Sequence, residues 1–248
     1  MEKSEGVQWW GGRGAVQSFA AMTASITAAA GGRTSVGKKV AVAATGLIGV
    51  GFVFAHMVGN LKVFLGREPI NHYGEFLRDM GEPIFPRSFV LWTLRLVLIS
   101  AVVIHITLTY QLMQQSRRAR PIGYEYTEPV RKNPAARTMR WGGTALLLFI
   151  VFHLADFTWG VHPDFQRGEV YHNLITGFTR VPVTVIYLAA MFALAMHLYH
   201  GTWSVTQTLG VNQARWDRTI RRGATALAVV IAGGYSIVPL AVLFRLVK

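Results

Sequence analysis

The sequence predicts an all-α integral membrane protein with five transmembrane helices. Hydrophobic residues make up 52% of the 248 residues and charged residues only 15%, a poor composition for a soluble surface. Five long apolar segments each reach the roughly 20 residues that a helix needs to cross the hydrocarbon core. Because no alternating strands of about ten residues appear, we expect helices to satisfy the backbone hydrogen bonds in lipid.

The five spans are separated by connections that carry charges, glycines and prolines. We expect residues 1–37 to form a cytoplasmic tail, either mobile or with an interfacial helix over residues 15–30, and residues 38–248 to form the membrane domain. The predicted spans are Val40 to Leu65, Phe89 to Met113, Trp141 to Gly160, Val181 to Leu209 and Gly223 to Leu246.

The charge distribution indicates a membrane partner and an orientation. The net charge is +13, but the basic residues cluster between apolar runs, which is typical of a protein facing an anionic lipid leaflet and argues against nucleic acid. Most of the 25 basic residues lie in the N-terminal tail and in the second and fourth connections. The positive-inside rule therefore predicts a cytoplasmic N-terminus and a C-terminus outside.

Histidines are the candidate metal ligands of this chain. The absence of cysteine excludes disulfides and iron–sulfur ligation from its own residues. One histidine lies in each of the first four predicted spans, at His56, His105, His153 and His197. A single imidazole at membrane depth is usually explained by an interhelical hydrogen bond, but four such residues favour a shared binding function.

Depth sorts the four histidines into two pairs. His56 and His153 lie nine and seven residues from the outer ends of their spans, whereas His105 and His197 both lie sixteen residues from theirs. The second pair is therefore about 12 Å deeper at the helical rise per residue. Two imidazoles at one depth can ligate a six-coordinate haem, so we infer two haems b, outer and inner.

Two features near the histidines have alternative interpretations. Gly46, Gly49, Gly51, Gly59 and Gly201 provide room for porphyrins or simply allow close helix packing. His200 lies one turn from His197 and is the alternative inner ligand, although the depth of His197 matches that of His105 better.

Several motifs resemble a known family. The stretch GLIGVGFVFAHMVGNLKVFLG around His56 is followed by INHYGEFL, and FHLAD and MHLYHG surround His153 and His197. Over about Val40 to Lys248, the sequence resembles the single-chain, five-helix, dihaem cytochrome b subunit of succinate dehydrogenase and fumarate reductase. The H-x-x-G-N piece is the most specific part of this likeness.

The resemblance implies a function and partners. It implies a multi-pass subunit of the bacterial cytoplasmic membrane, anchoring a flavoprotein subunit and an iron–sulfur subunit and exchanging electrons with quinone, commonly menaquinone. Succinate chemistry would then occur on the partner subunits and not on this chain. The likeness also implies outer haem ligation by spans one and three, and inner haem ligation by spans two and four.

Other polar residues are candidates for supporting roles. Quinone chemistry needs proton-exchanging groups, and the first outer loop contains His72, Tyr73, Glu75, Asp79 and Glu82. We prefer Glu75 because it belongs to the family-like motif, whereas Glu82 precedes Pro83 in a predicted turn. The cations Lys62 and Arg95 at membrane depth are candidate haem-propionate partners, with snorkelling as the alternative for Lys62. Asp156 is a candidate to orient a propionate partner or to relay protons, unless it forms an interhelical hydrogen bond.

Two competing functions fit parts of the pattern. The dihaem cytochrome b of a hydrogenase or formate dehydrogenase uses the same kind of haem site with different partners, which co-purification would distinguish. A transporter with proton-relaying or metal-binding histidines is a more remote alternative, which haem absorbance would exclude.

Overall fold

The structure is a computed structural model that describes residues 34–119, 134–211, 213 and 215–248, with backbone alone for 134–138. In this part of the chain all regular structure is helical and no strand occurs. The helices are α2 (Ser35–Leu61), the 3₁₀ helix η1 (Lys62–Leu65), α3 (Arg67–Asp79), α4 (Phe89–Arg118), α5 (Pro134–Phe157), α6 (Val170–Thr179), α7 (Val181–Thr208) and α8 (Asp217–Leu243). Apart from residues 34–37, the predicted tail lies outside the described residues.

Five of these helices are long and apolar enough to cross a membrane: α2 with η1, α4, α5 from Met139, α7 and α8. The predicted all-α fold with five spans is therefore confirmed, and the chain is a multi-pass membrane protein. The orientation of the N-terminus stays a prediction.

Polar turns extend three spans beyond their predicted apolar limits. Thr34 caps α2, and its hydroxyl accepts a hydrogen bond from the Gly37 amide at 3.1 Å, so this helix begins before Val40. The α4 helix continues to Arg118, where cationic side chains favour the carbonyl end of the helix dipole. The α8 helix begins at Asp217, an acidic residue in its first turn.

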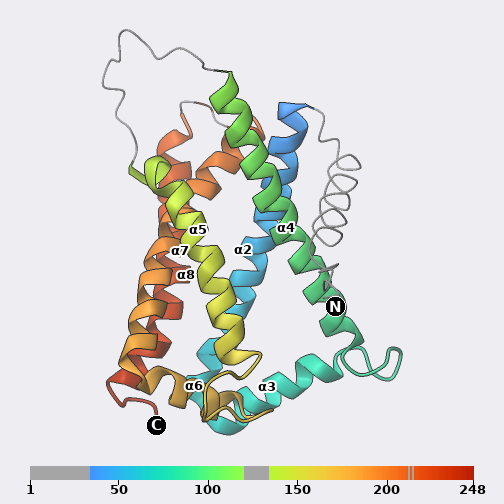
Figure 1. The fold of residues 1–248 in the computed structure, drawn as a ribbon, viewed down its shortest axis with the longest axis vertical. Coiled ribbons are helices and arrows are strands. Elements are labelled where there is room, and N and C mark those ends of the chain that lie inside the picture. Colours follow the sequence, from blue (N-terminus) through green and yellow to red (C-terminus); the bar gives the residue numbers. More distant parts are fainter. Residues whose placement is uncertain (1–33, 120–133, 212, 214) are drawn as a thin grey trace, which may run out of the picture.

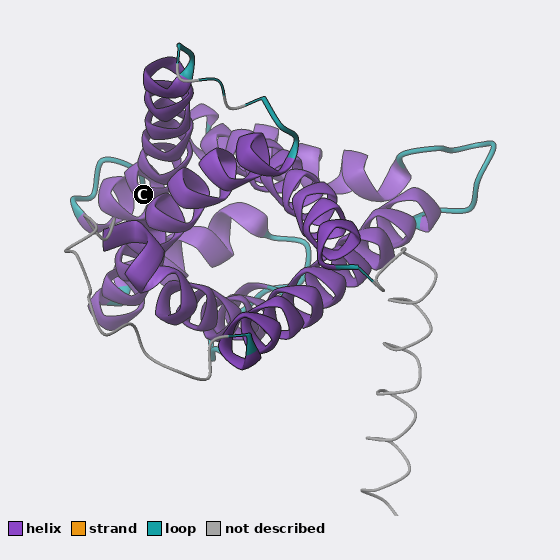
Figure 2. Ribbon diagram, turned by 90° about the horizontal axis from the view of Figure 1, so that it is seen from above, coloured by secondary structure: helices purple, strands orange, loops and turns teal. Residues whose placement is uncertain are grey.

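The spans pack in an arrangement that leaves two helix pairs apart (Figures 1 and 2). The α2 helix packs on α4, α5 packs on α7, and α8 packs on both α7 and α2. Among the described residues, neither α2 and α5 nor α4 and α7 pack extensively on each other. Seen from above, the helices surround a central region rather than forming one layer (Figure 2).

Two short helices lie across one end of the bundle, near the C-terminus (Figure 1). We name this end, formed by η1, α3, α6 and residues 244–248, the capped end. The prediction of a first outer loop was wrong, because residues 67–79 form α3. This helix is amphipathic and buries Ile70, which is 2% exposed, while Arg67 and Glu68 remain exposed. The predicted turn at Glu82 is confirmed.

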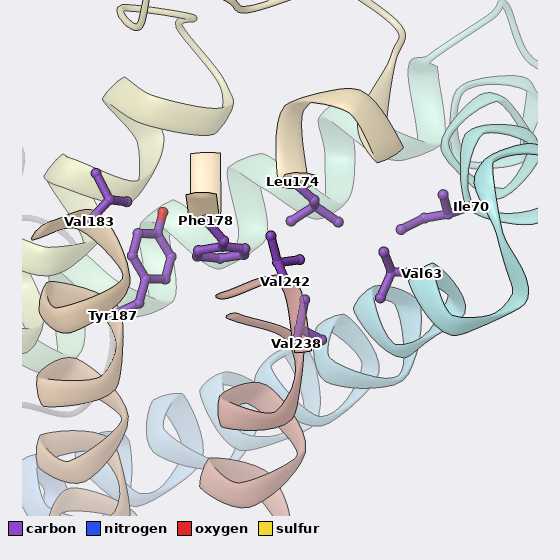
Figure 3. Packing of buried hydrophobic residues seen from close by; sticks show 8 residues of the cluster. All are labelled: Val63, Ile70, Leu174, Phe178, Val183, Tyr187, Val238 and Val242. Carbon is purple, nitrogen blue, oxygen red and sulfur yellow. The ribbon is translucent and has the colours of Figure 1, made fainter. Parts of the chain in front are cut away.

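A hydrophobic cluster joins the capped end to the spans (Figure 3). Its buried side chains come from η1, α3, α6, α7 and α8: Val63, Ile70, Leu174, Phe178, Val183, Tyr187, Val238 and Val242. Lipid provides no hydrophobic driving force between spans, but burial against water does so at the membrane boundary. This cluster therefore stabilises one end of a bundle in which α2 and α5, and α4 and α7, do not pack extensively on each other.

The contact between α2 and α8 depends on a close approach at a glycine. The hydroxyl of Tyr235 donates to the Val53 carbonyl at 2.7 Å, and Met57, 5% exposed, lies directly against Gly234. A Cβ at Gly234 would overlap the Met57 side chain, whereas a Cβ at Gly233 would meet nothing within 4 Å. Gly234 is therefore tightly packed, whereas its neighbour Gly233 has open space beside it.

We expect Gly234→Val to destabilise the protein by about 1–3 kcal/mol, because the added side chain overpacks the contact with Met57. Gly233→Val is the control and should change stability much less. Thermal unfolding in one detergent measures both variants, and equal midpoints for the two would contradict the packing described here.

Candidate functional site

Each of the four histidines predicted as ligands faces another histidine across the bundle. The imidazole centroids of His56 on α2 and His153 on α5 lie 5.9 Å apart. Those of His105 on α4 and His197 on α7 lie 6.3 Å apart. The structure thus brings together the same two pairs that depth predicted. Each pair joins two helices that do not pack extensively on each other.

These separations fit a metal between two imidazoles. A metal–imidazole bond is about 2 Å long, and the distance from ligand nitrogen to ring centroid adds about 1 Å on each side, so coaxial ligands give centroids roughly 6 Å apart. In the described ranges no three metal-ligating side chains converge on one point. A planar macrocycle would complete the coordination of a metal with two axial imidazoles.

Backbone contacts orient the His105 ring. Its Nδ1 lies 3.1 Å from the Val42 carbonyl oxygen and 3.2 Å from Oγ1 of Thr45. Because a carbonyl can only accept, Nδ1 carries the proton and donates it, leaving Nε2 as the unprotonated nitrogen. This arrangement is typical of metal-ligating histidines. Gly46 makes room for the ring, since a Cβ there would lie 3.3 Å from Cε1 of His105.

The His153 ring is oriented by a tyrosine. Its Nδ1 lies 3.0 Å from the hydroxyl of Tyr187, which is only 6% exposed. The Tyr187 ring is itself held by Phe149 and Phe178, each with a centroid separation of 4.9 Å. Tyr187 belongs to the hydrophobic cluster of Figure 3, so its hydroxyl links this cluster to the candidate ligand His153.

The structure favours His197 over His200 as the partner of His105. The His197 ring faces His105, whereas the ring contact given for His200 is with Trp203, at 6.0 Å. The Nδ1 atoms of both histidines are buried without a hydrogen-bond partner among the described residues. His56, in the other pair, stacks on Phe52 with centroids 5.3 Å apart and an interplanar angle of 11°.

The other glycines proposed to make room for porphyrins divide into two kinds. Gly49, Gly51 and Gly201 have no described atom within 4 Å of a Cβ position, which leaves space beside their helices. Gly59 instead admits the ring of Tyr73 from α3, since a Cβ there would lie 2.7 Å from the tyrosine Cε1. That contact joins the capped end to α2 one turn beyond His56.

The two cations predicted at membrane depth contact aromatic rings. The Lys62 ammonium lies 5.2 Å from the centroid of the Tyr73 ring, and the Arg95 guanidinium lies 4.9 Å from that of Trp92. Lys62 is half-buried, whereas Arg95 is exposed in the isolated chain. Its assignment to a haem propionate stays a prediction.

Glu75 lies on α3 beside a polar cleft of the capped end. Its carboxylate forms ion pairs with Arg78 and, at 2.5 Å, with Arg87. The cleft has a volume of about 550 Å³, and it is lined by Arg67, Glu68, Asn71, His72, Glu75, Arg167, Gly168 and Glu169. Hydrogen bonds from Arg67, at 2.9 Å, and Asn71 lower the pKa of the Glu169 carboxyl from its usual value. This charged surface suits proton exchange with water better than contact with an apolar ring.

A buried charge pair beside His153 was only partly anticipated. Asp156, 5% exposed, accepts a hydrogen bond from Nη2 of Arg180 at 2.6 Å. Sequence reasoning singled out Asp156 but missed Arg180 and Tyr187. Their signals were an arginine immediately before the fourth span and a tyrosine two turns inside it.

The resemblance to a cytochrome b family depends only on the motifs quoted above. No protein-family model matches the chain, and neither a curated protein nor a solved structure matches it. The geometry of the two histidine pairs therefore provides the independent support for a function.

We expect Tyr187→Phe to lower stability by about 1 kcal/mol, because it removes a buried hydrogen bond and leaves Nδ1 of His153 without this partner. Tyr171→Phe is the matched control, since it removes an exposed hydrogen bond to the Lys248 carbonyl. Thermal unfolding in one detergent compares the two variants. A larger loss in the control would contradict the role of Tyr187.

Proposed function

We propose that this chain is a dihaem cytochrome b that anchors a succinate:quinone oxidoreductase, either a succinate dehydrogenase or a fumarate reductase, in the membrane. The observation that carries the proposal is the pair of facing histidine couples, each bridging helices that do not pack extensively on each other. Family-like motifs around His56, His153 and His197 favour this complex over other complexes that contain a dihaem cytochrome b.

The residues of the chain have separate roles in this proposal. His56 and His153 would hold the outer haem, and His105 and His197 the inner haem. Bound haem supplies reversible one-electron chemistry at its iron. With no cysteine in the chain, the haems would be held without covalent thioether links, by the paired imidazoles and by packing. The hydrogen bonds at Nδ1 of His105 and His153 would keep each ring oriented for haem binding.

The partner subunits and the quinone substrate are inferred from the family resemblance. Electrons would pass between an iron–sulfur subunit at the cytoplasmic face and a membrane quinone, commonly menaquinone, with a flavoprotein subunit carrying the succinate chemistry. Reduction of a quinone to a quinol consumes two electrons and two protons, so the site needs proton-exchanging groups. In this proposal, Glu75 exchanges those protons at the polar cleft of the capped end, close in sequence to Tyr73, which packs on α2.

The same histidine geometry also supports a second candidate, the dihaem cytochrome b of a hydrogenase or formate dehydrogenase. Purification of the native complex distinguishes the two, because a succinate-oxidising flavoprotein should accompany the chain only in the first case.

We expect the purified protein to contain two haems b per chain, measured by pyridine haemochrome analysis. His56→Ala and His153→Ala should remove one redox component, and His105→Ala and His197→Ala the other, because each pair shares one iron. His200→Ala is the control and should retain both.

One haem or none in the wild-type protein would refute the proposed cofactor content. Loss of the same component from the His56→Ala and His105→Ala variants in a redox titration would refute the pairing.

We expect Glu75→Gln to abolish quinone turnover while both haems and succinate oxidation with an artificial acceptor survive, because the substitution keeps the shape and removes the titratable group. Glu68→Gln is the matched control, since Glu68 lines the same cleft on the same helix. Unchanged quinone activity in the Glu75 variant, or equal loss in both, would move the proton-exchanging site elsewhere.

A further inference from the structure

The ion pair between the buried Asp156 carboxylate and the partly exposed Arg180 guanidinium lies one helical turn from a candidate ligand of the outer haem. We infer that this pair sets the reduction potential of that haem through two opposed charges. The inference rests on the proposed function, and it gives Asp156 and Arg180 the role of tuning residues rather than ligands.

The pair is held in a position that excludes water from the carboxylate. Asp156 is 5% exposed, and its Oδ1 lies 2.6 Å from Nη2 of Arg180. Its second oxygen, Oδ2, and Nε of Arg180 are buried without hydrogen-bond partners among the described residues. An ion pair with a buried carboxylate and unsatisfied buried atoms is weak evidence for stability, which favours a functional reason for keeping it.

The ion pair is connected to the histidine by two helices. Asp156 follows His153 by three residues on α5, so the two side chains are neighbours on the helix surface. Arg180 caps the N-terminus of α7, the helix that carries Tyr187 two turns later. The Asp156–Arg180 pair and the His153–Tyr187 hydrogen bond therefore form two successive links between α5 and α7.

A tightly packed glycine of α6 lies beside this link. A Cβ at Gly177 of α6 would lie 2.8 Å from Cζ of Phe157 and 3.8 Å from Nη2 of Arg180. Any larger residue at Gly177 would displace the Phe157 ring, which belongs to the aromatic group around Tyr187. Gly177 therefore makes room for the Phe157 ring, while Nη2 of Arg180 lies in ordinary contact distance of the same position.

The nearest additional titratable group contributes no competing charge near neutral pH. His162 is 6% exposed, and burial, aided by the positive charge of Arg180, lowers its pKa below the ordinary value. An imidazole whose pKa is depressed in this way is neutral at pH 7. Further away, Asp164 and His172 interact electrostatically with His162. His162 therefore adds no positive charge to the Asp156 carboxylate and the Arg180 guanidinium beside His153.

Opposed charges in a medium of low dielectric constant have opposite effects on a neighbouring iron. The Asp156 carboxylate favours the oxidised, more positive haem, whereas the Arg180 guanidinium favours the reduced haem. Removing either charge leaves the other uncompensated. A purely structural link would behave differently, because both substitutions would loosen the same contact and disturb the haem in the same way.

The test is a redox titration of the intact complex. Visible and electron paramagnetic resonance spectra report the oxidation state of each haem during the titration. Asp156→Asn should make the outer haem easier to reduce by about tenfold in its reduction equilibrium, equivalent to about 59 mV for a one-electron couple. Arg180→Gln should shift the same haem by a similar amount in the opposite direction. The double variant should return close to the wild-type potential, and Arg180→Lys should remain near it because the charge is kept.

The inner haem is the internal control and should not move in any of these variants. Shifts of the same sign in the two single variants, or no shift in either, would overturn the inference while leaving the dihaem proposal intact. Absence of haem from the wild-type complex would refute the proposed function, and the inference with it. Should Arg180→Gln fail to fold, the near-isosteric Asp156→Asn decides alone, and an unchanged or lowered potential would overturn the inference.

Discussion

The cost of placing an imidazole at membrane depth governs the organisation of this bundle. Lipid offers a histidine side chain no hydrogen-bond partner, so each ring requires a partner inside the protein or a bound ligand. His105 and His153 meet this requirement at Nδ1, with a backbone carbonyl and a tyrosine hydroxyl respectively. Each of these two rings faces a second histidine across the bundle. The helices that carry each pair do not pack extensively on each other.

A bundle in which two helix pairs do not pack extensively on each other gains stabilisation elsewhere. The capped end provides it, where α3 and α6 cover the spans and bury Ile70 and Phe178 against them. The hydrophobic effect acts there because water is the alternative environment, whereas lipid removes that driving force deeper in the membrane. The same cluster contains Tyr187, so the contacts that stabilise the capped end also orient a candidate ligand.

The two histidine pairs therefore lie in different surroundings. The outer pair has an aromatic group and a buried ion pair beside it, on α5, α6 and α7. The inner pair has a backbone carbonyl and a threonine hydroxyl on one side, and at His197 an Nδ1 without a described partner on the other. Under the proposed function, these unlike surroundings would give the two haems different reduction potentials.

The sequence by itself determined the five spans, the one histidine in each of four, and the depths that pair them, because hydrophobic length and helical rise are properties of local sequence. It did not predict α3 and α6, because both are short amphipathic helices that become stable only against the spans they cover. Arg180 and Tyr187 were missed for a related reason. Their roles depend on where α7 lies against α5, and that contact between distant segments was decided only by the tertiary structure.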